Sequence, residues 1–159
     1  LDHLLLVNGH AGNTGLLEHV ARKIKAVHGI TMAMFAPLSF VTTEFKKELY
    51  GKDVEKLGHG GDLMGSLNLY LWPEDVNIKA TAPQNRMHQG FYMQGLAAMK
   101  FKDTSVNFYL DMDEISPDGT MGDPTMARAD RGERMMERIV SYGVEFVQAF
   151  KKMKTRLRV

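Results

Sequence analysis

Histidine and aspartate occur in two glycine-rich stretches of the sequence, and each stretch precedes a segment with a helical pattern. In the first, "VNGHAGNTG" over residues 7–15, His10 is flanked by glycines. In the second, "GHGGDLMGS" over residues 58–66, His59 is followed by Asp62. Neutral imidazole and carboxylate suit Zn²⁺, Mn²⁺ or Fe²⁺, and His59 or Asp62 can also move a proton to or from a bound water. The pattern therefore indicates a metal site or an acid–base pair.

Each of these side chains also has a structural explanation. His10 can be a polar turn residue that bonds to the backbone of its own loop. Asp62 can cap the helix that follows it, where a carboxylate lies near the positive end of the helix dipole. The two loops alone leave both explanations open.

The composition limits the classes of function. With 159 residues, 44% hydrophobic and 25% charged, the chain is typical of one globular domain, so we expect a single domain over residues 1–159, and the order of elements described below makes it an α/β domain. A net charge of +1 gives no electrostatic case for binding nucleic acid or an anionic membrane. The absence of cysteine excludes thiolate ligands and suits a cytoplasmic protein. Any metal here needs nitrogen and oxygen ligands.

The elements around His10 follow from hydrophobic patterning. The apolar run Leu4–Val7 predicts a strand buried on both faces of a parallel sheet. Asn13 is then the expected N-cap of a helix with apolar residues at i, i+3 and i+4 spacing, and a second strand is expected over Ile30–Phe35. This order places His10 beyond the carboxyl end of a strand, where open α/β sheets bind ligands.

The remaining chain contains two further helical signals. The second glycine loop opens a helical stripe that Pro73 stops. Asp123 as N-cap and Pro124 as first helical residue predict a long helix to Phe150, followed by a basic tail. A strand is expected near Phe108–Leu110, and the segment 76–107 has no firm assignment.

Three stretches of this sequence resemble the creatinine amidohydrolase (creatininase) family. They are "LLLVNGHAGN", "GHGGDLMGSLNLYLWPEDV" and "SPDGTMGDPTMARADRGERMMERIV". The N-G-H-x-G-N element after a strand and the G-x-x-G-D-P element before the last helix are specific in combination. The resemblance covers nearly the whole chain and implies that it corresponds to the C-terminal portion of the family's domain.

The resemblance implies a Rossmann-like three-layer αβα fold with a mainly parallel sheet, and a homo-oligomer. It implies a metal-dependent hydrolase that acts on a cyclic amide or related small molecule through a metal-bound water, with Zn²⁺ preferred over Mn²⁺ or Fe²⁺. His10 maps to a metal ligand and His59 to a proton-transfer residue at the substrate. Asp62 fills a position that is acidic in many members, which implies metal ligation or acid–base work.

The sequence also departs from the family pattern. The family's H-A-G-x-x-E-T-S element has Met64 and Gly65 here in place of glutamate and threonine. Gly12 stands where the creatinine-cleaving branch has an acid, so a substrate other than creatinine is expected. No match to the family's N-terminal E-x-H-G type segment follows Leu1. Two alternatives therefore stay open: a hydrolase that opens an oxidised inositol ring of the 3-dehydro-scyllo-inosose type, and a non-catalytic relative.

Overall fold

The structure is a computed structural model that describes residues 1–78, 87–94, 97–116 and 118–154. The chain divides into two compact units, one of residues 1–45 with the C-terminal residues from Met136, and one of residues 46–135. Helices and strands both occur, so the expected mixed α/β class is confirmed. No helix of the described ranges is long and apolar enough to cross a membrane.

The first unit is built on a parallel pair of strands. Strand β1 (His3–Val7) pairs with β2 (Thr31–Phe35) in a register that sets Leu5 opposite Ala33. Helix α1 (Thr14–His28) connects them, and Gly29 ends this helix with a φ of 68°, a left-handed conformation that glycine adopts without strain. The strand, loop, helix and parallel strand expected around His10 are therefore confirmed.

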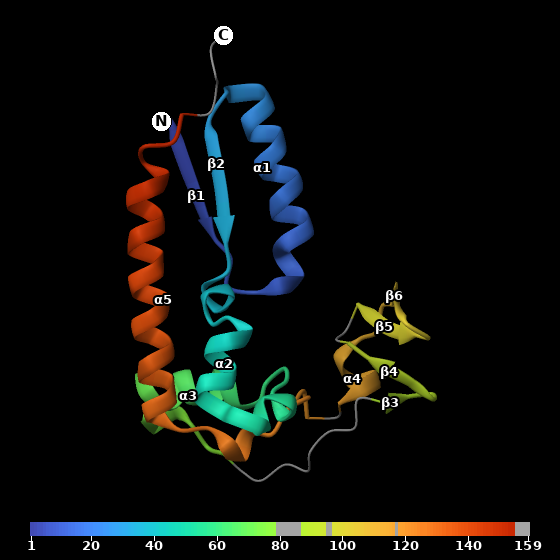
Figure 1. The fold of residues 1–159 in the computed structure, drawn as a ribbon. Helices are drawn as coiled ribbons and strands as arrows, with labels where there is room; N and C mark the ends of the chain where they lie inside the picture. Colours follow the sequence, from blue (N-terminus) through green and yellow to red (C-terminus); the bar gives the residue numbers. More distant parts are fainter. Residues whose placement is uncertain (79–86, 95–96, 117, 155–159) are drawn as a thin grey trace. The chain divides into compact units, whose positions relative to one another are not determined.

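Aromatic side chains attach the C-terminal part of helix α5 (Ala129–Phe150) to the strand pair, on the side away from α1 (Figure 1). The ring of Phe35 on β2 lies 5.6 Å from that of Phe146 and 4.9 Å from that of Phe40. Arg138 donates a hydrogen bond of 2.7 Å to the Phe40 carbonyl. The strand pair is thus covered by aromatic rings, and Arg138 fixes the turn that carries Phe40 to helix α5.

A four-stranded antiparallel sheet forms part of the second unit. Its strands run in the order β3 (Met87–His88), β4 (Phe91–Met93), β5 (Ala98–Phe101) and β6 (Thr104–Asn107). Met93 pairs with Met99, and Phe101 pairs with Thr104.

The expected mainly parallel sheet is therefore not confirmed in the described ranges, where one pair is parallel and a separate sheet of four strands is antiparallel. The physical reason is the length of the connections. Gln89 and Gly90 join β3 to β4 with φ values of 48° and 86°, as in the two-residue hairpins that only antiparallel strands allow.

The helices of this part of the chain follow the sequence pattern with two corrections. Helix α3 (Asp62–Leu71) ends before Pro73, as expected. The long helix α5 begins at Ala129, not at Pro124, because Asp123 caps a separate single turn by accepting a 3.0 Å hydrogen bond from the Thr125 N–H. The expected strand at Phe108–Leu110 was wrong, since these residues form no regular element. The other helical elements are α2 (Thr43–Tyr50), α4 (Met112–Ile115) and the 3₁₀ turns Ala11–Asn13, Pro37–Phe40, Gly51–Lys56, Pro73–Asp75 and Pro124–Met126.

Helices α3 and α5 meet where Gly132 lies against the backbone of Ser66. A Cβ added at Gly132 would overlap the Ser66 carbonyl group. A Cβ at Gly143 of the same helix would meet nothing nearer than the Phe35 ring, at 4.0 Å. Gly132 therefore has no space for a side chain, whereas Gly143 has space for one.

We predict opposite effects for alanine at these two positions. Gly132→Ala should lower the free energy of unfolding by about 1–3 kcal/mol, since the close backbone contact must open. Gly143→Ala should raise it by roughly 0.5–1 kcal/mol, because alanine loses less backbone entropy in a helix. Urea unfolding of both variants measures the difference. Equal changes in the two proteins would contradict the described contact.

Candidate functional site

The His10 loop follows β1 directly and is organised by a buried asparagine. The Asn8 side chain is 3% exposed; its amide donates to the Thr14 hydroxyl at 3.1 Å and its carbonyl accepts the His10 N–H at 3.2 Å. The exposed His10 ring accepts a hydrogen bond from the Gly12 N–H at Nδ1, 3.2 Å away, and so caps the turn that follows. Asn13, the expected cap, makes no such side-chain bond.

This geometry determines which nitrogen of His10 carries the proton. The Gly12 N–H can only donate, so Nδ1 of His10 must be unprotonated and the neutral ring holds its proton on Nε2. Binding a metal through Nε2 would therefore require His10 to release its cap. Moreover, no three histidine, aspartate or glutamate side chains gather as a metal site in the described part of the chain. These residues by themselves do not fit a metal centre.

His59 belongs to the second unit, and its Nδ1 faces a hydrogen-bond acceptor where that of His10 faces a donor. Its Nδ1 lies 3.1 Å from the Gly119 carbonyl oxygen, and its own carbonyl accepts the Met121 N–H at 2.7 Å. A carbonyl can only accept, so Nδ1 carries the proton and the neutral ring presents a lone pair at Nε2. The ring is exposed, and Nε2 makes no hydrogen bond with any described residue. His59 is thus placed as a proton acceptor toward solvent.

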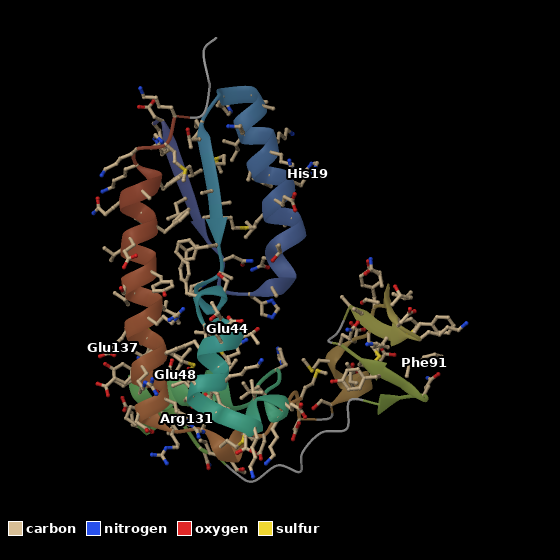
Figure 2. All side chains as sticks on the ribbon, viewed as in Figure 1. His19, Glu44, Glu48, Phe91, Arg131 and Glu137 are labelled. Carbon is tan, nitrogen blue, oxygen red and sulfur yellow. The ribbon has the colours of Figure 1, made fainter. Side chains whose placement is uncertain are left out.

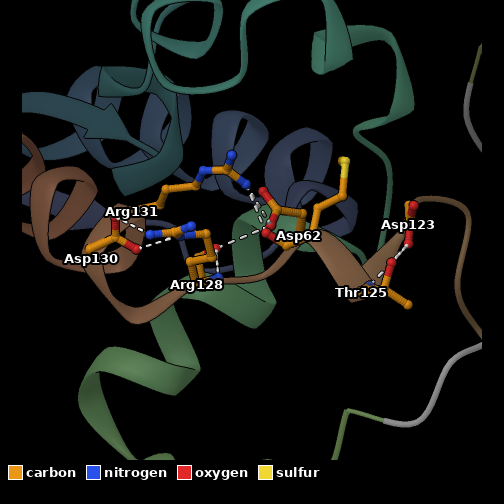
Figure 3. Close-up of polar contacts among 8 residues, drawn as sticks. Asp62, Asp123, Thr125, Arg128, Asp130 and Arg131 are labelled. Carbon is orange, nitrogen blue, oxygen red and sulfur yellow. Dashed lines mark hydrogen bonds and ion pairs between the residues drawn. The ribbon is translucent and has the colours of Figure 1, made fainter.

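Asp62, the first residue of α3, is fully buried. Its Oδ1 accepts a hydrogen bond from the Ser66 hydroxyl at 3.2 Å and lies 3.9 Å from Nη1 of Arg131 (Figure 3). Burial raises the pKa of the Asp62 carboxyl, while the neighbouring Tyr50 and Ser66 hydroxyls and the Arg131 charge lower it in part. Burial, with the adjacent Asp62 carboxylate, also raises the pKa of Tyr50.

The surroundings of Asp62 are those of a buried, paired carboxylate. Its charge faces a guanidinium, and its side chain has no exposed surface. Gly61, not Asp62, is the N-cap of α3. Of the three expected site residues, His59 and Asp62 lie in one unit and His10 lies in the other.

Sequence reasoning missed the groups that hold His59 and Asp62. Ser66 and Arg131 surround the carboxylate, and the Gly119 carbonyl orients the imidazole. Gly119 opens the G-x-x-G-D-P element, which was a signal that this segment matters. Ser66 is the serine of the second quoted stretch and lies four residues after Asp62, but no role was assigned to it, and nothing in the spacing marks Arg131.

Comparison with known proteins decides the family. The model of the creatininase family, described as creatinine amidohydrolase, matches residues 1–147. The chain belongs to the creatininase family. No curated protein sequence matches it.

Solved creatininases share this fold. One named creatinine amidohydrolase (creatininase) has a TM-score of 0.66 at 21% identity, over 96% of this chain and 58% of its own. A creatininase named with Mn and a mutant of Zn–Zn type each have a TM-score of 0.61, at 22% and 20% identity, over 92% of this chain and 56% of theirs. The chain thus spans little more than half the length of these creatininases.

The raised pKa of Asp62 predicts an unusual dependence of stability on pH. The folded protein keeps this proton at pH values where the unfolded chain has lost it, so Asp62 lowers stability as pH rises above about 4. The unfolding free energy of the wild type minus that of Asp62→Asn should therefore fall as pH rises from that value. Denaturant unfolding at several pH values measures it.

Asp130→Asn is the matched control. The hydrogen bond from Arg128 lowers the pKa of the exposed Asp130 carboxyl, so its contribution to stability is lost as pH falls below about 4. The wild type minus Asp130→Asn difference should thus be small and should change in the opposite sense. If the difference in unfolding free energy changed with pH in the same direction for both variants, the burial of Asp62 would be contradicted.

Proposed function

We propose that this protein is a hydrolase acting on a cyclic amide or related small molecule, with His59 as the proton-transfer residue. The observation that supports this most is the bond from His59 Nδ1 to the Gly119 carbonyl, which leaves Nε2 of an exposed ring as a base. Membership of the creatininase family supports the class of reaction. Gly12, in place of an acid, favours a substrate other than creatinine.

In the proposed reaction, water attacks the carbonyl carbon of the substrate and the C–N bond breaks. The Nε2 lone pair of His59 takes the proton that the attacking water loses, and the resulting imidazolium returns it to the leaving nitrogen. The Gly119 carbonyl stabilises this imidazolium, because it already accepts the Nδ1 proton. One imidazole thus serves as base and then as acid.

We also propose that the intact enzyme holds a divalent metal, Zn²⁺ preferentially, with His10 among its ligands. The named Mn and Zn–Zn creatininases support this, as does the exposed position of His10 after a parallel strand. The described residues do not complete a metal centre, so no step of the reaction is assigned to the ion. The homo-oligomer and the larger three-layer fold belong to the same proposal for the whole protein.

Replacing His59 tests the proposed reaction. His59→Gln should lower kcat/KM for the cyclic amide that the wild type hydrolyses by roughly 10²- to 10⁴-fold, because proton transfer is lost. His19→Gln, on the outer side of α1 (Figure 2), should leave it unchanged. The assay follows ring opening over a panel of cyclic amides and an oxidised inositol, with Zn²⁺ or Mn²⁺ supplied. Equal activity in the His59 and His19 variants would overturn the role of His59.

Elemental analysis tests the metal. The wild type and His19→Ala should retain zinc or manganese after dialysis, and His10→Ala should retain less, because one imidazole ligand is gone. Equal metal in all three proteins would remove His10 from the ligands. A wild type that takes up no metal after reconstitution, and hydrolyses nothing, would favour a non-catalytic family member.

A further inference from the structure

Two segments of the second unit, residues 56–66 and residues 119–132, are in contact at several points. At one end, the Asp123 N–H donates to the Lys56 carbonyl at 3.2 Å and the Met121 N–H donates to that of His59 at 2.7 Å. At the other, the Arg128 N–H donates to the Ser66 hydroxyl at 3.0 Å. Hydrogen bonds therefore connect the segments at both ends.

Glycines bring the two backbones into direct contact. A Cβ at Gly58 would overlap the Met121 carbonyl, and one at Gly61 would lie 3.0 Å from the Gly122 Cα. No side chain separates the segments at these points, so neither can slide without opening the contact. We therefore expect a displacement of one segment to displace the other.

Asp62 and its hydrogen-bond partners also connect the two segments. The Ser66 hydroxyl donates to Asp62 and accepts from the Arg128 backbone, so one buried oxygen connects both segments. Arg131 faces the carboxylate (Figure 3). It also donates a hydrogen bond of 2.8 Å to the Met126 carbonyl and stacks over the Tyr50 ring at 4.5 Å.

Removing the carboxylate would leave the partly buried Arg131 without its counter-ion. The Arg131 side chain is 24% exposed, so without its counter-ion the guanidinium would favour a position with more water around it. Such a movement would pull on the Met126 carbonyl, which accepts a hydrogen bond from Arg131, and on the segment that leads back to Gly119. The imidazole of His59 depends on that segment for its Nδ1 acceptor.

We propose that Asp62 is a positioning residue for His59, and neither a metal ligand nor a proton donor. Asp62 holds segments 56–66 and 119–132 in register, and this register keeps the Gly119 carbonyl on Nδ1 so that Nε2 of His59 stays the base. The inference rests on the proposed function of His59.

The tautomer of His59 tests the inference without any substrate. Long-range ¹H–¹⁵N NMR of the intact, ¹⁵N-labelled protein, at a pH where the ring is neutral, shows which ring nitrogen carries the proton. The wild type should show the Nδ1–H form. Asp62→Asn should shift His59 toward the Nε2–H form. Asp130→Asn, which removes an exposed aspartate paired with Arg128, should leave the Nδ1–H signature unchanged.

Several results would overturn the proposal. One is a wild type in which His59 is Nε2–H, and another is a folded Asp62→Asn protein with unchanged His59 signals. If Asp62→Asn fails to fold, Ser66→Ala decides, because it cuts the hydroxyl bridge and leaves the charge pair in place. Unchanged signals in that variant, or failure of both to fold, would show that Asp62 acts on the fold and not on His59.

Kinetics separate this proposal from the proposed function. If the tautomer responds to Asp62→Asn and no protein hydrolyses a cyclic amide, the positioning role stands and the proposed reaction fails. If the wild type hydrolyses its substrate and Asp62→Asn leaves the His59 tautomer unchanged, only the positioning role fails. Where both hold, Asp62→Asn should lower kcat and displace the pH–rate profile of His59, an effect that a purely structural change would not produce.

Discussion

The packing of the second unit depends on the carboxylate of Asp62, which has no exposed surface. A charge removed from water needs a counter-ion and hydrogen bonds. Oδ1 of Asp62 faces Ser66 on its own helix and Arg131 at the start of α5, whereas the buried Oδ2 has no hydrogen-bond partner among the described residues. The contacts of Oδ1 require the two helices to lie against each other. The segment that precedes α5 then runs back along the His59 loop, and the backbone contacts follow from that course.

Close approach of two backbones explains why these loops are rich in glycine. Gly58 and Gly61 lie against Met121 and Gly122, and Gly132 lies against Ser66. Glycine-rich loops before helices often cradle anions, but these glycines are in contact with protein. Their role is to let one loop of the fold support another.

The two histidine loops look alike in sequence and differ in chemistry. The His10 Nδ1 accepts from the Gly12 N–H, whereas the His59 Nδ1 donates to the Gly119 carbonyl. Opposite backbone partners give the two neutral rings opposite tautomers. His59 therefore offers its outer nitrogen as a base, while the outer nitrogen of His10 is protonated until its cap is released.

The sequence by itself determined the parallel strands around His10, helix α1 and the end of α3, because periodicity and Pro73 act through nearby residues. It left the strands between Met87 and Asn107 unassigned and began the last helix too early, since weak alternation and a single capped turn carry no clear local signal. Only the tertiary structure decided that Asp62 faces Arg131 and that Gly119 sets the tautomer of His59. Such partners are distant along the chain, and residue spacing does not specify which distant groups meet.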